Sequence, residues 1–141
     1  MFEIVLVGAD NSITARRAVE AAVELAEMSH GTLHILTAFE TKPFDASGLP
    51  SEFKAIGNES GPDALLQSLS FIAKKRGIEP VMHASKDGPE DALMKIAEEI
   101  HADLIVVGNR GMKGARRVLG SIPNSVAHNA PCSVLIVDTT E

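Results

Sequence analysis

The chain has 141 residues, of which 45% are hydrophobic, and it carries a formal net charge of −6 at pH 7. This length and composition fit a single domain with a sizeable core and do not suggest a membrane protein. The acidic balance argues against a broad nucleic-acid footprint, which would normally make the whole domain basic. Cys132 is the only cysteine, so an intramolecular disulfide and a cysteine-based zinc cluster are excluded. We therefore expect one domain over residues 1–141 in a reducing cytoplasm.

Four nearly continuous apolar runs predict strands that are covered on both faces. These runs cover residues 2–7, 33–39, 104–107 and 133–137. A weaker run at residues 78–83 predicts a fifth strand. The first run is far too short to span a bilayer, so we expect a strand there and no membrane segment.

Between the strands, apolar residues recur at every third or fourth position, which predicts amphipathic helices. The expected helices cover residues 15–26, 65–73, 93–100 and 122–130. Their boundaries carry typical residues, namely Ser12 as a cap, Pro62 and Pro89 near first turns, and Gly31 and Gly77 after helix ends. Strands and helices therefore alternate. This alternation predicts an α/β fold with a five-stranded parallel sheet, right-handed crossovers and helices on both faces.

Residues 40–61 form a long irregular connection within this domain. Glycines and prolines are scattered there among polar and aromatic residues. A connection of this length inside a compact α/β domain is usually functional or mobile. Phe44, Leu49 and Phe53 could make it a lid over a ligand or a docking segment for a partner, and a loosely packed excursion explains it equally well.

A glycine-rich segment connects the strand at residues 104–107 to the helix at residues 122–130. It reads Gly108-Asn109-Arg110-Gly111, then eight residues, then Gly120-Ser121. Glycines on such a loop let backbone N–H groups approach an anion closely, and the helix points its positive dipole end at the same place. The segment contains no Asp or Glu and four basic residues, which are Arg110, Lys113, Arg116 and Arg117. The pattern indicates a phosphate site, with a solvated basic loop as the alternative.

Two well-known phosphate-binding motifs do not match. The P-loop motif GxxxxGK[ST] needs Gly-Lys followed by Ser or Thr, which occurs nowhere in the chain. The dinucleotide motif GxGxxG fails because Gly108, Gly111 and Gly114 have the wrong spacing and follow the fourth strand instead of the first. P-loop kinase or GTPase chemistry and nicotinamide or flavin dehydrogenase chemistry are therefore disfavoured.

A third pattern matches in outline, and it belongs to the universal stress protein family. Nucleotide-binding members carry a glycine after the fourth strand, two residues, a second glycine, usually nine residues, and Gly-Ser or Gly-Thr. Gly108, Gly111 and Gly120-Ser121 fill these places, with eight intervening residues in this chain. Further similarity to the family lies in residues 4–12, 88–89, 102–108 and 121–137. The chain therefore resembles this family over nearly its full length, and only residues 40–61 lack family markers.

The resemblance implies an open sheet with the strand order 3-2-1-4-5, in a Rossmann-like fold similar to the adenine nucleotide alpha hydrolases. The first and fourth strands then lie side by side at a topological switch point. Open α/β sheets bind ligands outside the carboxyl ends of their strands at such a point. Asp10 and Gly108, almost a hundred residues apart, would thus flank one crevice.

The resemblance also implies a set of residues around an adenine nucleotide. Gly8, Ala9 and Asp10 would line the base and ribose, Ala38 would lie beside the base, and Val107 and Gly108 would contact the sugar. The phosphates would receive backbone N–H groups from Gly111, Gly120, Ser121 and Ile122, and the hydroxyl of Ser121. Asp10 could instead, or in addition, cap the first helix. Mg²⁺ could accompany the phosphates.

The sequence shows no catalytic group. Ser12 and Ser121 lack an evident general base. The histidines, which are His30, His34, His83, His101 and His128, show no metal-ligand spacing. We therefore assign no catalytic residue and no metal ligand, and we expect surface or satisfied core histidines.

The leading functional hypothesis is a cytosolic, homodimeric stress-response protein. It would bind ATP or another adenine nucleotide and use occupancy to bias its partner contacts. The resemblance implies that the last strand, Cys132 to Val137, pairs across the dimer, since it would otherwise be an exposed edge. A slow ATPase with a metal bridging the phosphates is one alternative. Another is a protein that binds AMP or cyclic AMP, or a nucleotide-free dimeric interaction module, because the eight-residue spacing leaves less room for β- and γ-phosphates. We expect no nucleic-acid or membrane partner.

Overall fold

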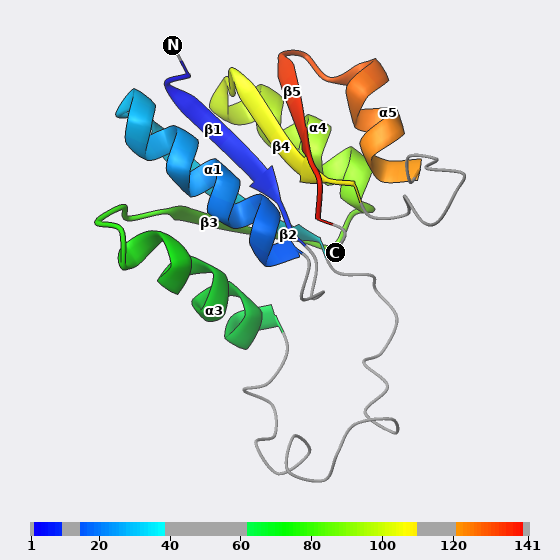
Figure 1. The fold of residues 1–141 in the computed structure, drawn as a ribbon. Coiled ribbons are helices and arrows are strands. Elements are labelled where there is room, and N and C mark those ends of the chain that lie inside the picture. The colour runs from blue at the N-terminus through cyan, green and yellow to red at the C-terminus, as the bar shows by residue number, and fades with distance from the viewer. Residues whose placement is uncertain (1, 10–14, 39–61, 110–120, 140–141) are drawn as a thin grey trace, which may run out of the picture.

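The protein forms an open, five-stranded parallel sheet with helices on both faces (Figure 1). The computed structural model describes residues 2–9, 15–38, 62–109 and 121–139. The strands are β1 (Ile4–Gly8), β2 (Thr32–Ala38), β3 (Val81–Ser85), β4 (Leu104–Gly108) and β5 (Ser133–Val137). The helices among the described residues are α1 (Ala15–Ser29), α3 (Pro62–Lys74), α4 (Pro89–Ile100) and α5 (Ser121–Asn129). The strand order is β3-β2-β1-β4-β5, which confirms the predicted fold class and order.

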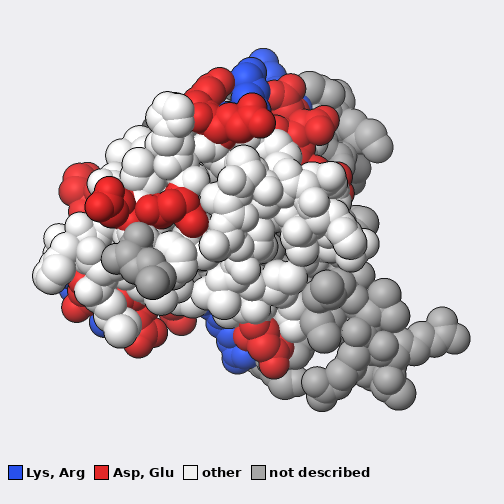
Figure 2. Space-filling view, turned by 90° about the horizontal axis from the view of Figure 1, so that it is seen from above, with Lys and Arg blue, Asp and Glu red and all other residues white. Residues whose placement is uncertain are grey.

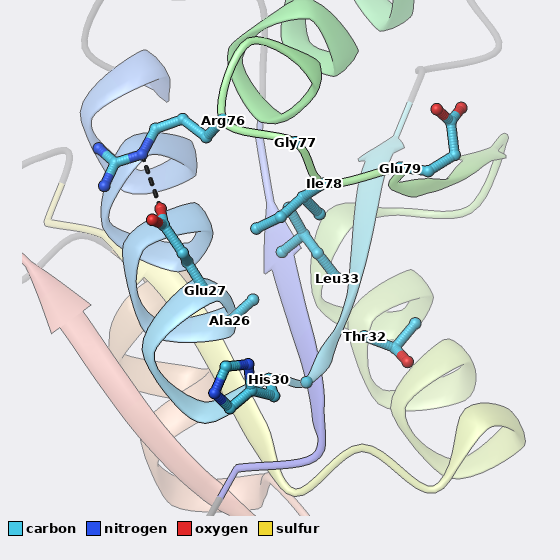
Figure 3. A pocket seen from close by; sticks show the side chains of 10 residues that line it. Ala26, Glu27, His30, Thr32, Leu33, Arg76, Gly77, Ile78 and Glu79 are labelled. Atoms are coloured by element: carbon cyan, nitrogen blue, oxygen red, sulfur yellow. Dashed lines mark hydrogen bonds and ion pairs between the residues drawn. The ribbon is translucent and has the colours of Figure 1, made fainter.

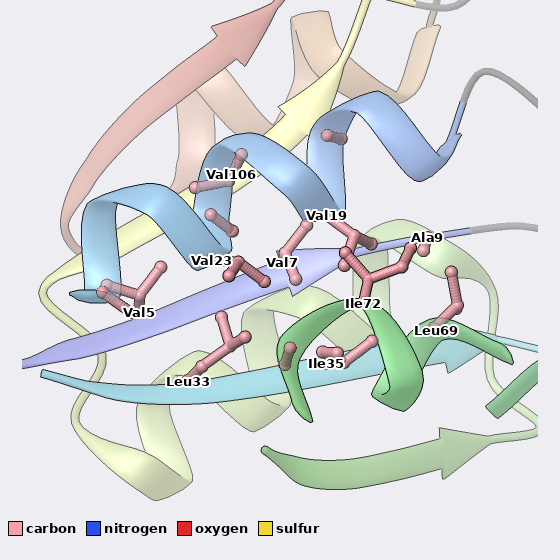
Figure 4. Close-up of a cluster of buried hydrophobic side chains, with 14 of the residues drawn as sticks. Val5, Val7, Ala9, Val19, Val23, Leu33, Ile35, Leu69, Ile72 and Val106 are labelled. Carbon is pink, nitrogen blue, oxygen red and sulfur yellow. The ribbon is translucent and has the colours of Figure 1, made fainter. Parts of the chain in front are cut away.

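Two helical layers cover the sheet. Helices α1 and α3 pack on one face, where Val5, Val7 and Ile35 belong to a large apolar cluster (Figure 4). Helices α4 and α5 pack on the other face against Leu6 and Ile105. Successive residues of a strand point to opposite faces, so a strand buried on both sides is apolar at every position. Each fully buried Val or Leu side chain contributes about 1.5–3 kcal/mol to the stability of the fold.

The start of β1 is attached to the start of β4. The carboxylate of Asp103 accepts hydrogen bonds from the backbone N–H groups of Glu3 at 2.8 Å and Ile4 at 3.1 Å. The backbone N–H of Asp103 donates to the carbonyl of Ile4 at 3.0 Å. These bonds fix the two central strands to each other at their amino-terminal ends.

The third strand in chain order begins later than the sequence predicts. The apolar run predicts a strand at residues 78–83, whereas β3 begins at Val81. Residue Ile78 belongs to the turn that ends α3, because its N–H donates to the carbonyl of Ala73 at 3.1 Å, and Gly77 has a φ of 80°. The apolar side chain of Ile78 packs on the first core cluster, as is common just after a helix end. The apolar character of Ile78 therefore serves the helix end.

The residues at the helix ends agree only in part with those predicted. Pro62 and Pro89 begin α3 and α4, close to the predicted first turns. After α1, the left-handed residue is His30, with a φ of 55°, and Gly31 follows it. A Cβ at Gly31 would lie 2.5 Å from the carbonyl oxygen of Phe2, so this glycine permits a close approach to the chain before β1. Ser12 and residues 40–61 lie outside the described residues.

No helix in the described part of the chain is both long and apolar enough to span a membrane.

Candidate functional site

The carboxyl ends of β1 and β4 lie side by side at the centre of the sheet. The two strands pair in parallel, with Val7 opposite Val106. Gly8 ends β1 opposite Leu36 of β2 and Ala9 follows it, while Val107 and Gly108 end β4 at the same edge of the sheet. β2 pairs with one side of β1, and β4 pairs with the other side. The strand order therefore reverses at β1, and at such a switch point open α/β sheets bind ligands. The structure thus brings these four predicted site residues together.

The glycine at position 8 has a packing role. A Cβ on Gly8 would lie 3.0 Å from a terminal methyl carbon of Leu93, a residue of α4. This separation is tighter than ordinary van der Waals contact, so a side chain here would push against the helix. Gly8 therefore lets α4 approach the end of β1 closely, whatever else its backbone contacts.

Gly108 allows the chain after β5 to pass close to the end of β4. A Cβ on Gly108 would lie 2.9 Å from Cγ2 of Thr139. Thr139 is only 2% exposed, so its side chain has little space into which to move. The absence of a side chain at position 108 therefore makes room for Thr139.

A buried polar cluster joins the ends of β4 and β5. The side-chain oxygen of Asn109 accepts hydrogen bonds from the N–H of Thr139 at 2.8 Å and from its hydroxyl at 3.0 Å. The side-chain nitrogen of Asn109 donates to a carboxylate oxygen of Asp138 at 3.1 Å, and its N–H donates to the carbonyl of Val137 at 2.9 Å. These four residues, 137–139 and Asn109, form what we call the Asn109 cluster. Their bonds join the carboxyl ends of β4 and β5, and the roles of Asn109, Asp138 and Thr139 were not predicted from the sequence.

The end of β2 borders the switch point on the β1 side. Ala38 is the last residue of β2, and the N–H of Ala9 donates to the carbonyl of Leu36 at 2.9 Å. The hydroxyl of Thr37 is buried, and it has no hydrogen-bond partner within the described structure. An unpaired buried hydroxyl costs about 1–3 kcal/mol. Thr37 thus places a buried polar group next to the last residue of β2, in a strand that is otherwise mostly apolar.

Two predicted site residues contact the core. Val107 is buried in the cluster under α4 and α5, and Ile122 is partly buried and packs against the same cluster. Ser121 begins α5, so the positive end of that helix dipole lies at this residue. The predicted site residues Asp10, Gly111 and Gly120 lie outside the described residues, as do the basic side chains of the glycine-rich segment.

A separate cavity of about 450 Å³ lies near the opposite, amino-terminal ends of the strands (Figure 3). Its walls come from the end of α1, the start of β2 and the segment before β3. Nε of Arg76 lies 2.8 Å from a carboxylate oxygen of Glu27 at its rim, so these two charges neutralise each other. From this end of the molecule, Asp and Glu side chains form several groups around a broad uncharged area (Figure 2). This cavity therefore shows no basic surface for an anion.

The sheet order, with its reversal between β1 and β4, defines a doubly wound, Rossmann-like α/β protein. A model of the universal stress protein family matches residues 1–138. A universal stress protein of Mycobacterium tuberculosis is 35% identical over 99% of this chain and 98% of the relative. A putative universal stress protein of Staphylococcus aureus is 27% identical over 99% of this chain and 86% of the relative.

Solved structures give the same result. A crystal structure of a universal stress protein in complex with cAMP is 33% identical, with a TM-score of 0.75 and coverage of 99% of this chain and 98% of the other. The universal stress protein UspA from Lactobacillus plantarum is 26% identical, with a TM-score of 0.72 and coverage of 96% and 97%. The chain belongs to the universal stress protein family, as its motifs predicted.

Proposed function

We propose that this protein binds an adenine nucleotide at the carboxyl ends of β1 and β4. The observation that carries the proposal is the meeting of Gly8 and Ala9 with Val107 and Gly108 at the switch point of the sheet. The similar universal stress protein that was crystallised with cAMP supports an adenine nucleotide as the ligand class. The acidic balance of the whole chain agrees with a small local ligand better than with a nucleic acid.

In this proposal, the base and ribose of the nucleotide contact one part of the chain and the phosphate contacts another. Gly8, Ala9, Asp10 and Ala38 line the base and ribose, and Val107 and Gly108 contact the sugar through backbone atoms. Gly111, Gly120, Ser121 and Ile122 offer N–H groups to the phosphate at the start of α5. Such N–H groups stay protonated at every relevant pH, and the helix dipole favours an anion beside them.

ATP and cyclic AMP are the two candidates within this class. The glycine-rich segment supports ATP, because its pattern matches in outline that of the family's nucleotide-binding members. The relative crystallised with cAMP and the eight-residue spacing between Gly111 and Gly120 favour the cyclic monophosphate. Mg²⁺ would accompany ATP but is not needed by a ligand with one phosphate.

Calorimetric titration of nucleotide-stripped protein separates these candidates. ATP, ADP, AMP and cAMP are each added with and without Mg²⁺. Binding of any of them that is lost in Gly120→Glu and kept in Gly88→Glu supports the site, because Gly88 faces open space. Absence of heat with all four nucleotides would contradict the proposal.

The same proposal includes a cytosolic homodimer that regulates partners in the stress response. The edge strand β5 supports pairing across a dimer, since it borders the sheet and Leu135 is 37% exposed. Leu135→Glu should then shift the sedimentation of the protein from dimer to monomer, whereas Val81→Glu on the opposite edge strand should not. A wild-type monomer at micromolar concentration would contradict this part.

Slow ATP hydrolysis stays a secondary candidate. Turnover that survives repurification and vanishes in Gly120→Glu would establish it. We expect binding without turnover, because the sequence offers no nucleophile beside a general base.

A further inference from the structure

Two histidines from neighbouring strands form a hydrogen bond at half-buried positions. Nδ1 of His34 in β2 lies 2.9 Å from Nε2 of His83 in β3. The ring centroids are 5.1 Å apart and the ring planes are inclined by 18°. The centroid separation is close to the nitrogen separation plus the distance from each nitrogen to its own ring centre. The two rings therefore meet nitrogen to nitrogen and nearly in one plane. We call these two residues the histidine pair.

The histidine pair connects the edge strand β3 to the rest of the sheet. β3 is the last strand on its side, so β2 is its only neighbouring strand. The two strands pair from His34 opposite Val81 to Ala38 opposite Ser85. No other side-chain hydrogen bond joins β2 to β3 in the described part of the chain. Elements with few covered positions open locally at a lower free-energy cost than the core, and Val81 and Ala84 of β3 are exposed.

The surroundings of the histidine pair on the two strands and on β1 are uncharged. Leu36 lies on the same face of β2 as His34, is paired with His83, and belongs to the cluster under α4 and α5. The pair therefore lies on the face of the sheet that α4 covers. The strand residues that share this face beside the pair carry no charge, and they are Ile4, Leu6, Thr32, Leu36, Val81 and Ser85.

One charged group of α4 acts on the pair. Burial lowers the pKa of His34, and the neighbouring His83 lowers it further. Burial also lowers the pKa of His83, and the negative charge of Glu99 opposes that shift. The other charged side chains in the last two turns of α4, Lys95 and Glu98, are exposed. Both rings are therefore neutral near neutral pH, and each takes up a proton only under more acidic conditions.

The first and the second proton taken up by the pair have different consequences. In the neutral pair, one of the two facing nitrogens carries a proton and the other accepts it. The first added proton binds the outer nitrogen of the donor ring. That ring becomes an imidazolium, which donates a charge-assisted hydrogen bond to the neutral ring, and the rings stay together. The second proton binds the accepting nitrogen, so that two N–H groups and two positive charges face each other.

We propose that the histidine pair is a pH-sensitive switch that holds β3 on β2 until both rings are protonated, whereupon β3 opens locally. His34 belongs to a strand that is paired on both sides, whereas His83 belongs to a strand that is paired on one side only. Repulsion between the two rings therefore moves His83 and the edge strand that carries it. The nucleotide is not required, because neither histidine belongs to its proposed site.

The test is hydrogen–deuterium exchange of the full-length protein at a series of pH values, from neutral to the lowest at which the sheet stays folded. Each exchange rate is divided by the intrinsic rate at the same pH. Imidazole ¹⁵N NMR on the same samples shows how many protons the pair carries. We expect the pair to titrate in two separate steps. Protection of the β3 amides should fall at least about tenfold in the second step, which corresponds to one pKa unit between the closed and the open form. Amides of β1 and β4 should keep their protection.

Single variants give the sharpest comparison. His34→Gln and His83→Gln each leave one ring, whose imidazolium can still donate to the glutamine carbonyl. Each single variant should therefore lose the acid-induced opening as completely as the double variant does. The matched control is His128→Gln, which removes an exposed histidine of α5 and should keep the opening.

The wild-type measurement decides the matter even if a variant fails to fold. Unchanged protection of β3 when both rings are protonated overturns the proposal, because the side chains would then separate without moving the strand. Failure of the second ring to take up a proton while the sheet is folded overturns it too. Acid-induced opening of β3 that persists in a folded single variant has the same consequence, because repulsion between two charged rings would not be its cause.

Discussion

The Asn109 cluster and the pair formed by His34 and His83 differ in burial and in their ability to change charge. In the Asn109 cluster, the neutral residues Asn109 and Thr139 are buried and Asp138 is exposed, and the side-chain oxygen and nitrogen of Asn109 are both hydrogen-bonded. The histidine pair, in which Nδ1 of His34 in β2 lies 2.9 Å from Nε2 of His83 in β3, is half-buried and consists of two groups that can change their charge. The buried amide and hydroxyl of Asn109 and Thr139 do not titrate, whereas a half-buried imidazole pair responds to protons. The carboxyl end of β4 is therefore held by groups that keep their charge, and the edge at β3 by groups that can change it.

Removing the centre of the Asn109 cluster should have the largest effect. Asn109→Ala leaves the N–H and hydroxyl of Thr139 without their acceptor, and we expect a loss of about 2–3 kcal/mol in the free energy of unfolding. Urea denaturation measures the loss. The control is Asn129→Ala, whose exposed side chain bonds only to Ser125 and should cost about 0.5 kcal/mol or less. Equal losses in both variants would contradict the special role of the cluster.

Crowding the same cluster should have a somewhat smaller effect. Gly108→Ala places a Cβ 2.9 Å from Cγ2 of Thr139, and we expect a loss of about 1–2 kcal/mol from overpacking. Gly88→Ala is the control, because a Cβ there meets nothing within 4 Å.

A second substitution tests the cause. Thr139→Ser removes Cγ2 and keeps the hydroxyl, so Gly108→Ala should cost much less in that background. Undiminished loss in the double variant would show that Thr139 is not what Gly108 accommodates.

Acidification should reduce the contribution of the histidine pair to stability. The pKa values of His34 and His83 are lowered in the folded protein, so the unfolded chain takes up protons first as the pH falls below about 6.5. The stability from the neutral pair is therefore complete above that pH and is lost as the pH falls through the folded pKa values. Urea midpoints at several pH values should decline less in the double variant His34→Gln/His83→Gln. Identical pH profiles for this variant and the wild-type protein would contradict the prediction.

The smallest effect is expected from a polar contact that is open to water. Arg76 and Glu27 form an ion pair with both side chains about half exposed. Glu27→Gln should lower the free energy of unfolding by about 0.2–1 kcal/mol, and added salt should erase the difference. A salt-independent loss as large as that of Asn109→Ala would remove the distinction between buried and exposed polar groups.

Much of the fold could be predicted because strands covered on both faces are apolar at nearly every position. The run from Leu104 to Val107 shows this in four consecutive apolar residues, all buried in β4. The run at Ser133 to Val137 predicted the bounds of β5, but its expected coverage on both faces was wrong, because β5 is an edge strand in which Ser133 and Leu135 are exposed. The start of β3 could not be predicted, because Ile78 is apolar for a different reason: it packs where α3 ends. The local pattern of apolar residues does not distinguish a residue buried in a strand from one that packs at a helix end.

The strand order around the candidate site was predictable, and the side-chain contacts beside it were not. The family order placed β1 beside β4, which the sheet confirms, whereas the ligand contacts expected of the glycine-rich segment stay a prediction. Asn109 acquires its role from residues 138 and 139, which come close only through the pairing of β4 with β5. The histidine pair depends in the same way on two strands 49 residues apart. Contacts of this kind have no local sequence signal.

The central position of β1 has a consequence for synthesis on the ribosome. Its neighbour β2 follows within about one helix, but its other neighbour β4 comes much later, and the bond from Glu3 to Asp103 spans 100 residues. At about 5–20 residues per second, β4 leaves the ribosome about 5–20 s after β1. During that interval one edge of the future central strand has no strand to pair with. The nascent half-domain is therefore the form of this protein most exposed to chaperones and to wrong pairing.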